Sequence, residues 1–365
     1  MVVHDSLYTT NPAQPLPGGP HRQPSPDRHC QSFALLQPSG PDLFVELELT
    51  VFALNIADPP PERMSMKDTK FIGIIGGSGF AALEDIEILE TRTVSTPWGP
   101  PSSPITLARV PTASSSHVRI AFISRHGLHH TITPSQIPNR ANIAALAHLK
   151  VHCILAFSAV GSLQEYIHPR DFVLPTQVID RTHGVRASTF FDNGIVAHTS
   201  FADPFDATLI RILQSCEAAI TESTLHVGGT LVCMGGPAFS TRAESELYRA
   251  WGGKVINMSC LPECTLAAEA EIPYAMICMS TDYDCWKTDE PPVDVARVIA
   301  NVSTNTQNAH RLIRAAMEHI AVDASIGESL GARRGTMRHA CVTAPHARNQ
   351  KALEDLEYIL PGYFS

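Results

Sequence analysis

The stretch from Val255 to Trp286 constrains the fold of this chain more than any other part of the sequence. It reads VINMSCLPECTLAAEAEIPYAMICMSTDYDCW and predicts a strand, a helix and a second strand. The first apolar run ends at Asn257, Met258 and Ser259, and the second ends at residues 281–284, Thr-Asp-Tyr-Asp. In alternating α/β folds, ligands bind at the carboxyl ends of the strands, so these polar positions are candidate binding residues.

The same alternation extends over residues 70–320 and shows no internal repeat. It predicts a single α/β domain with a central mixed sheet flanked by helices. Residues 182–205 are expected to form a long irregular connection, and such loops are usually functional or lie at an interface. The other predicted strands are Lys70–Ile75, Ile105–Val110, Val118–Ser124, Val151–Phe157, Asp171–Arg181 and Gly228–Cys233, and the helices are Pro138–Leu149, Asp206–Ile220, Arg242–Trp251 and Val295–Ile320.

Composition narrows the class of protein. The 365 residues are 44% hydrophobic and 17% charged, which fits a globular enzyme with a large core. The net charge of −9 and the lack of a long Lys/Arg run argue against nucleic acid as a partner. Nine cysteines, an odd number scattered through apolar runs, favour a reducing intracellular compartment. We therefore expect a cytoplasmic location, with the nucleus as a second compartment.

The two ends of the chain differ from the middle. Residues 1–66 contain 11 of the 28 prolines, and we expect a disordered extension without an assigned function. Its most apolar run, residues 44–56, is too short and too charged to cross a membrane. Met64 and Met66 also fit a start of translation just before the first core strand. Residues 67–365 are expected to form the domain, with 321–351 as a variable loop segment.

Hydrogen-bond donors follow several of the predicted strands. The Gly76–Gly79 turn exposes backbone N–H groups and adds the Ser78 hydroxyl, although such a turn is equally compatible with a structural role. Arg125 and His126 end another strand, where a guanidinium suits a phosphate oxyanion. Ser158 and Ser259 add hydroxyls at two further strand ends. Together these groups predict an oxyanion site.

A metal site is not predicted. The histidines at 126, 129 and 130 have no carboxylate or cysteine at ligand spacing, and the Cys260–Cys264 pair has no matching second pair. The Gly76–Gly79 turn also lacks the third spaced glycine of the dinucleotide fingerprint, which makes a nicotinamide oxidoreductase a distant alternative. We expect neither a metal nor an organic cofactor.

Asp282 and Asp284 have the opposite character, since carboxylates suit a ligand edge rich in N–H groups. Adenine presents an N6 amino donor beside the N7 acceptor, so a carboxyl that carries a proton can serve N7 while its neighbour accepts from N6. Protonation at N7 makes adenine a better leaving group. Phosphate held on the other side would then attack a sugar carbon of oxocarbenium character, and general acid help of this kind is typically worth ~10²–10⁴ in rate.

The motifs together resemble those of the methylthioadenosine phosphorylases, a branch of the trimeric purine nucleoside phosphorylase family. The resemblance covers residues 70–320 and rests on IGIIGGSG, TPWG, RHG with His130, NRANIAAL, SAVGSL, VIDRT, GPAFSTRAE, INMSCLPE and STDYDCW. It implies phosphorolysis of S-methyl-5'-thioadenosine to adenine and 5-methylthioribose 1-phosphate, in methionine and purine salvage. Inorganic phosphate is then a co-substrate, and the chain is expected to form a homotrimer.

The resemblance also implies a role for each matching residue. Ser78, Arg125, His126, Ser158, Ser259 and the backbone of Ala159 would bind phosphate. Met258 would contact the ribose, Phe239 the base, and Tyr283 would join the substrate-binding set. Asp282 would act as the acid at N7, with Asp284 at N6.

Substrate preference would depend on a further group of positions. Ser240 stands where the 6-oxopurine branch has a glutamate, and Val295 stands where that branch has a histidine for the 5'-hydroxyl. Val295 and Val298 would line an apolar pocket for a methylthio group. A hydroxyl left unpaired in such a pocket costs ~1–3 kcal/mol. His198 and Ile359 are candidates for the wall supplied by a neighbouring subunit.

The chain departs from the family pattern at one loop. It reads Gly235-Gly236-Pro237-Ala238-Phe239 where the family usually has Glu-Gly-Pro-Arg-Phe. The change either removes an internal ion pair without touching the ligand or loosens the loop that holds Phe239. Two alternative functions therefore stay open: a phosphorylase that prefers adenosine or a 6-oxopurine nucleoside, and a nucleoside-binding protein deficient in turnover.

Overall fold

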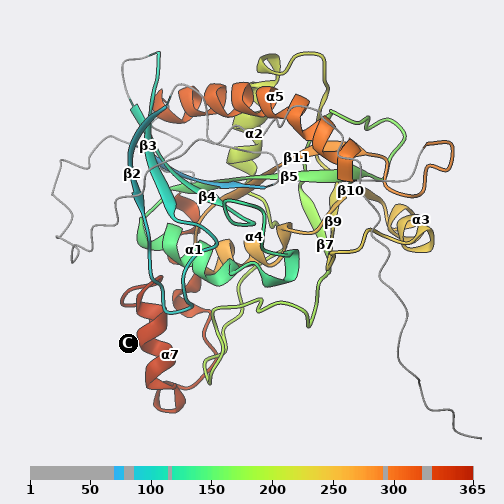
Figure 1. The fold of residues 1–365 in the computed structure, drawn as a ribbon. Helices are drawn as coiled ribbons and strands as arrows, with labels where there is room; N and C mark the ends of the chain where they lie inside the picture. The colour runs from blue at the N-terminus through green and yellow to red at the C-terminus, as the bar shows by residue number, and fades with distance from the viewer. Residues whose placement is uncertain (1–69, 78–85, 114–116, 291–294, 323–330, 365) are drawn as a thin grey trace, which may run out of the picture. The chain divides into compact units, whose positions relative to one another are not determined.

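The computed structural model describes residues 70–77, 86–113, 117–290, 295–322 and 331–364 (Figure 1). Predictions for residues 1–66, for Ser78 and for the first part of the 321–351 segment lie outside the described residues. The core is an 11-stranded mixed sheet in the order β2-β3-β4-β1-β5-β10-β9-β7, and β11 pairs with β5 and β6. This architecture confirms the α/β class with a central mixed sheet.

Four strands, β1 to β4, come before the first α-helix, and the later strands are separated by helices singly or in groups. The strands are β1 (Phe71–Gly76), β2 (Glu87–Arg92), β3 (Ile105–Pro111), β4 (His117–Ser124), β5 (Cys153–Ser162), β6 (Phe172–Leu174), β7 (Gln177–Arg181), β8 (Leu225–Val227), β9 (Thr230–Met234), β10 (Gly253–Asn257) and β11 (Tyr274–Asp282). The α-helices are α1 (Asn139–His148), α2 (Ala207–Ser215), α3 (Arg242–Ala250), α4 (Cys260–Glu269), α5 (Val295–Val322) and α7 (Gln350–Glu357).

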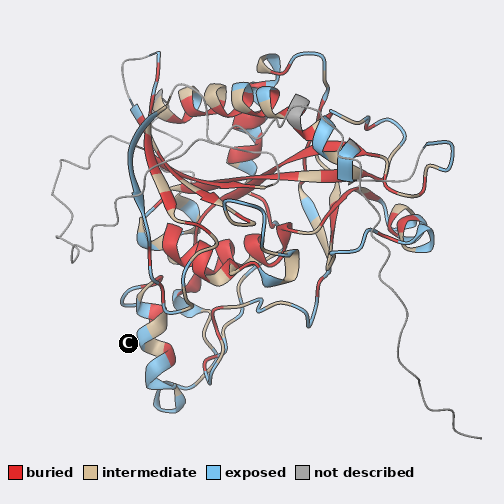
Figure 2. Ribbon diagram, viewed as in Figure 1, coloured by how far each residue is buried: buried red, intermediate tan, exposed pale blue. Residues whose placement is uncertain are grey.

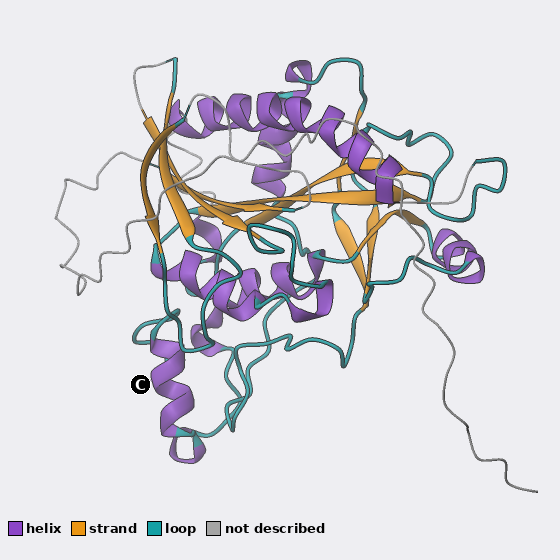
Figure 3. Ribbon diagram, in the orientation of Figure 1, coloured by secondary structure: helices purple, strands orange, loops and turns teal. Residues whose placement is uncertain are grey.

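Helices cover both faces of the sheet. Helices α2 and α5 lie on one face, and α1 and α4 lie on the other (Figure 3). The central strands β1 and β11 are therefore buried along their whole length (Figure 2). Burial on both faces explains why these strands read as continuous apolar runs rather than alternating ones. Among the described residues, no helix combines the length and the apolar character that a bilayer crossing needs.

The pairing of β5 with β11 positions the polar end of β11. These strands are parallel and keep one register from Tyr274 opposite Ile154 to Ser280 opposite Val160, and then the register shifts so that Asp282 lies opposite Gly161. Such a bulge leaves backbone groups unpaired and redirects the side chain that follows. Helix α5 compensates, because the Asn301 amide donates to the Thr281 carbonyl at 2.7 Å.

Several predicted boundaries were wrong. Strand β5 continues to Ser162, because its small residues still pair with β11 and β10; Ser158 and Ala159 therefore lie within the strand and not after it. The run Asp171–Arg181 forms two strands, β6 and β7, because Pro175 between them has no N–H for a ladder. Likewise, the predicted strand Gly228–Cys233 begins at Thr230, after two glycines with positive φ.

Three elements were missed, and one of them is the three-residue strand β8. Strand β2 is exposed at every residue and carries Glu87 and Glu90, so it has no apolar pattern that would reveal an edge strand. Helix α7 begins at the end of the 321–351 segment, after which no helix is predicted. The Asn349 side chain begins this helix by accepting a hydrogen bond from the backbone N–H of Ala352 at 3.0 Å.

Helix α2 provides a test of the local account of the fold. The Asp206 side chain accepts hydrogen bonds from the backbone N–H groups of Thr208 at 2.9 Å and Leu209 at 3.0 Å. We expect Asp206→Ala to lower the free energy of unfolding by ~1 kcal/mol, the typical value of an N-cap. The exposed Asp203 lies in the preceding loop, and Asp203→Ala is the control. Equal melting temperatures for the two variants would contradict the assignment of the cap.

Candidate active site

A cavity of about 300 Å³ lies where β5, β10 and β11 meet. Strand β10 runs antiparallel to β5, with Ile256 opposite Gly161, which brings the residues after β10 next to the middle of β5. The cavity wall includes the predicted residues Arg125, His126, Ser158, Ala159, Phe239, Ser240, Met258, Ser259, Asp282, Asp284, Val295 and Val298. Residues that are up to 173 positions apart in the sequence, from Arg125 to Val298, thus share one cavity.

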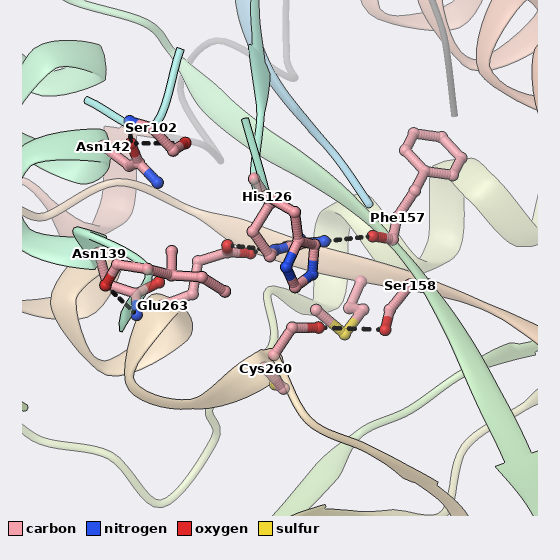
Figure 4. A network of polar contacts seen from close by, with 12 residues as sticks. Ser102, His126, Asn139, Asn142, Phe157, Ser158, Cys260 and Glu263 are labelled. Carbon is pink, nitrogen blue, oxygen red and sulfur yellow. Dashed lines mark hydrogen bonds and ion pairs between the residues drawn. The ribbon is translucent and has the colours of Figure 1, made fainter. Parts of the chain in front are cut away.

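Arg125 is held by a buried ion pair that sequence reasoning missed. Its Nε and Nη2 donate to the Glu263 carboxylate at 2.7 and 2.9 Å, and its Nη1 donates to the Phe157 carbonyl at 2.7 Å (Figure 4). The side chains of Arg125 and Glu263 are 1% and 0% exposed. Burial opposes the charged form, but the adjacent Glu263 outweighs it and raises the pKa of Arg125. The guanidinium is therefore fixed in position, with most of its charge already matched.

Gly77 allows this arrangement. A Cβ atom at Gly77 would lie 2.9 Å from Arg125 Nη1 and 2.9 Å from the Phe157 carbonyl oxygen. Both contacts are shorter than real Cβ contacts, so any side chain here would displace the guanidinium. Gly77 thus has a packing reason to lack a side chain.

The hydroxyl groups of Ser158 and Ser259 meet at the same end of the cavity. Their Oγ atoms are 3.1 Å apart, a contact marked at Ser158 in Figure 4. The Asn257 amide donates to Ser158 Oγ at 3.0 Å. All three side chains are buried. The amide orients both hydroxyls, a role that the position of Asn257 at the end of an apolar run does not reveal.

His126 is neutral in this cavity. Its Nδ1 lies 2.8 Å from the Ile132 carbonyl oxygen, which can only accept, so Nδ1 carries the proton. The pKa of His126 is lowered to about 4, mainly by burial, while the Ile132 hydrogen bond opposes the shift and the nearby Arg125, His130 and Arg186 contribute to it. The ring also stacks on His130, with centroids 4.3 Å apart. The imidazole is thus held by two contacts on the side of Arg125.

The two carboxylates lie at the other end of the cavity. Asp282 accepts hydrogen bonds from the Thr281 hydroxyl at 2.7 Å and from the backbone N–H of Asp284 at 2.8 Å. The buried Ser245 hydroxyl donates to Asp284 Oδ2 at 2.6 Å. Burial raises the pKa of Asp284, and the Ser245 bond opposes that rise. Thr281 and Ser245 are positioning residues that sequence reasoning missed.

Backbone geometry directs both carboxylates to the cavity, although not as expected. The apolar run is predicted to end at residues 281–284, and in a strand that continued there positions 282 and 284 would share a face because side chains alternate. Strand β11 ends at Asp282, however, and Asp284 lies beyond it with a φ of 53° in the left-handed region. The turn, and not strand alternation, brings Asp284 back to the cavity.

The Tyr283 side chain lies outside the cavity, in contrast to its predicted place in the substrate-binding set. Its ring packs edge-on against Trp286 at 5.9 Å, and Lys287 Nζ lies 4.4 Å from its centroid. Trp286 in turn donates to the Ser162 carbonyl at 2.8 Å. Tyr283 therefore packs against Trp286 and Lys287 and does not line the cavity.

The remaining wall of the cavity is open. Phe239 is 47% exposed and Val295 is 63% exposed, although both line the cavity. The two candidates for a neighbouring subunit do not line it in their own chain. His198 is exposed, and Ile359 is only 7% exposed because it packs in its own core. In the described part of the chain, no group of three His, Cys, Asp or Glu side chains has a geometry that suits a metal ion.

Gly161 lies beside both carboxylates. A Cβ atom there would lie 3.0 Å from Asp282 Oδ1 and 3.3 Å from the Asp284 Cβ. We expect Gly161→Ala to lower turnover by about 10²-fold, the scale of a small misplacement of a reacting group, with only a small loss of melting temperature. Gly235→Ala is the matched control, because a Cβ there meets nothing within 4 Å. Equal activity of the two variants would contradict this account.

The low pKa of His126 predicts a pH effect on stability. The unfolded chain takes up this proton near pH 6.5, whereas the folded chain takes it up only near pH 4. Since the unfolded state binds more protons between these values, the neutral ring contributes fully to the free energy of unfolding above pH 6.5, and this contribution is lost as the pH falls toward 4. We expect the melting temperature of His126→Gln to fall less steeply over this window than that of the unmodified protein. Parallel melting curves in phosphate-free buffers would show that His126 is not held neutral.

Comparisons with known proteins agree with this geometry. The family model of the phosphorylase superfamily matches residues 71–318. An S-methyl-5'-thioadenosine phosphorylase of Tuber melanosporum is 50% identical over 315 residues, which cover 84% of this chain and 100% of that protein. A protein of the same name from Yarrowia lipolytica is 47% identical, with 85% and 98% covered.

Solved structures give the same result. A methylthioadenosine phosphorylase from an Antarctic soil metagenomic library has a TM-score of 0.70 and 40% identity, covering 81% of this chain and 100% of that one. The enzyme of Schistosoma mansoni in complex with adenine has a TM-score of 0.69 and 32% identity, with 75% and 100% covered. The chain belongs to the phosphorylase superfamily and, within it, to the family of S-methyl-5'-thioadenosine phosphorylases.

Proposed function

We propose that this protein cleaves S-methyl-5'-thioadenosine with phosphate, giving adenine and 5-methylthioribose 1-phosphate. One observation carries the proposal: a single cavity has buried donors at one end and two buried carboxylates at the other. The relatives named for this reaction, at 47–50% identity, support the same substrate. The reaction would serve the salvage of methionine and purine.

The donor end of the cavity suits phosphate. In this proposal Arg125, Ser158, Ser259, the Ala159 backbone and Ser78 bind the anion, and His126 adds a polar ring nitrogen. The fixed positions of Arg125 and of the two hydroxyls support this, because preorganised donors need no rearrangement when charge develops. Neither a metal nor an organic cofactor is needed, since phosphate itself is the nucleophile.

The carboxylate end suits the base. We assign to Asp282 the proton for N7 and to Asp284 the hydrogen bond from the N6 amino group, with Phe239 against the ring. A raised pKa of Asp284 favours a proton within this carboxyl pair. Met258 would contact the ribose between the two ends. Ser240, Val295 and Val298 would select a 6-amino base and an apolar 5'-substituent.

We also propose a homotrimer in which a neighbouring subunit closes the open wall. The exposure of Phe239 and Val295 at the cavity supports this, because a 5'-methylthio group there would otherwise face water. His198 and Ile359 remain the candidates for that contact. The native mass in solution tests the assembly: three chains are expected, and a monomer with full activity would contradict it.

The free thiols of the described cysteines support a reducing location, and we propose the cytoplasm, with the nucleus as a second compartment.

The reaction is tested by release of free base. The protein is incubated with S-methyl-5'-thioadenosine, adenosine or inosine, with and without phosphate. We expect adenine from the first substrate only when phosphate is present. Base release without phosphate would exclude phosphorolysis, binding without release would favour a protein deficient in turnover, and a preference for inosine would contradict the roles of Asp284 and Ser240.

Asp282→Asn tests the acid. An amide cannot supply a proton to N7, so we expect kcat to fall ~10²–10⁴-fold while the nucleoside still binds. Asp289→Asn, on the exposed segment beyond Trp286, is the control and is expected to be fully active. Near-normal turnover of Asp282→Asn would remove this residue as the acid.

A further inference from the structure

The long loop of residues 182–205 contributes one side chain, Arg186, that reaches the walls of the cavity. Its Nη2 donates to the carbonyls of Gly235 at 2.9 Å and Met234 at 3.4 Å, and its Nη1 donates to the carbonyl of Leu261. Three backbone carbonyls from two separate segments thus share one guanidinium. A planar guanidinium suits this task because its donors lie in a fixed fork.

The two segments carry opposite ends of the proposed site. Met234 and Gly235 begin the segment that ends at Phe239, on the base side. Leu261 comes two residues after Ser259, on the phosphate side. Arg186 therefore links the base wall to the phosphate wall through the backbone of each.

This link bears on the departure from the family pattern at Gly235 and Ala238. A Cβ atom at Gly235 would meet nothing within 4 Å, so the segment has little side-chain packing at this point. The hydrogen bond from Arg186 to the Gly235 carbonyl holds the backbone here. The segment is therefore still held in place, although it lacks the Glu and Arg that the family usually has.

The loop itself is anchored, so Arg186 is held in place. The buried Glu269 carboxylate accepts hydrogen bonds from the Thr189 hydroxyl at 2.7 Å and from the Phe190 backbone N–H at 2.8 Å. Asp192 pairs with Arg140 of α1 at 2.7 Å. Both anchors lie within six residues of Arg186 in the chain.

The hydrogen-bond partners of the Arg186 guanidinium differ from those of Arg125. Arg125 faces the Glu263 carboxylate, whereas the partners of Arg186 among the described residues are carbonyl oxygens. Its buried Nε has no partner there either. Burial is the main cause of the low pKa of His126, and the charges of Arg125 and Arg186 lower it further, so Arg186 acts electrostatically on the phosphate side.

We infer that Arg186 is a positioning residue that holds the Met234–Phe239 segment against the start of α4 and supplies the phosphate side with a positive charge that no described carboxylate cancels. The inference rests on the proposed phosphorolysis. It gives the long loop a role in the site, and it explains how the segment is held without the family's Glu and Arg at positions 235 and 238.

The test compares Arg186→Gln, which removes the charge, with Arg186→Lys, which keeps it. Phosphate KM and nucleoside KM are measured separately for each variant after the unmodified protein has shown phosphate-dependent base release. We expect Arg186→Gln to raise the phosphate KM about tenfold and Arg186→Lys to raise it less than about threefold, since only the first loses the charge. Both should raise the nucleoside KM, because both lose the three-carbonyl link.

Arg140→Gln is the matched control. It breaks an ion pair of the same loop without a contact to either cavity wall, and both KM values are expected to stay within about twofold. An unchanged phosphate KM in Arg186→Gln, or equal values for the Gln and Lys variants, would overturn the inference. No base release by the unmodified protein would instead refute the proposed function, so the two failures are distinguishable.

Gly235→Glu provides a second measurement if Arg186→Gln does not fold. The open space at Gly235 accommodates the side chain, and the substitution places a carboxylate on the residue whose carbonyl Arg186 contacts. We expect it to raise the phosphate KM about tenfold by cancelling the charge while the nucleoside KM stays nearly constant. Gly235→Gln is the neutral control, and an equal phosphate KM in these two variants would contradict the charge role.

Discussion

The structure depends on the pairing of β5 with β11 and on the bulge that ends it. The two strands share one register up to Ser280, and the shift before Asp282 places this carboxylate against Gly161. Because Gly161 lacks a side chain, two carboxylates fit beside one backbone. Strand β10 then brings Asn257 and Ser259 to the other side of β5. Strand β5 therefore lies between the two carboxylates and the hydroxyl donors, which are only a few residues apart along it.

The electrostatic arrangement follows from this separation. A buried carboxylate and a buried guanidinium each cost several kcal/mol unless they are paired or hydrogen-bonded. Arg125 satisfies this condition through Glu263, and the aspartates do so through the Thr281 and Ser245 hydroxyls and a backbone N–H. Every charged group at the cavity is thus held before a ligand arrives. Preorganisation of this kind is what a reaction with developing charge requires.

Much of this was accessible from the sequence. The α/β class, the long connection at 182–205 and twelve cavity residues follow from polar positions that end apolar runs and from the family motifs. Partners that act through another residue were not accessible. Glu263 lies in an apolar helical run, and Asn257, Ser245 and Arg186 act only on neighbours that the fold brings near. The turn at Asp284 could not be predicted, because a strand that continued past Asp282 would point the Asp284 side chain in the same direction.

The central claim is that one cavity holds phosphate at its donor end and an adenine nucleoside at its carboxylate end at the same time. Titration calorimetry with an unreactive methylthioadenosine analogue, in the absence and in the presence of saturating phosphate, tests it most directly. The account predicts that the analogue binds in both conditions, with an affinity that phosphate leaves equal or increases. Loss of analogue binding when phosphate is present would show that the two ligands compete for one position, and this would contradict the account.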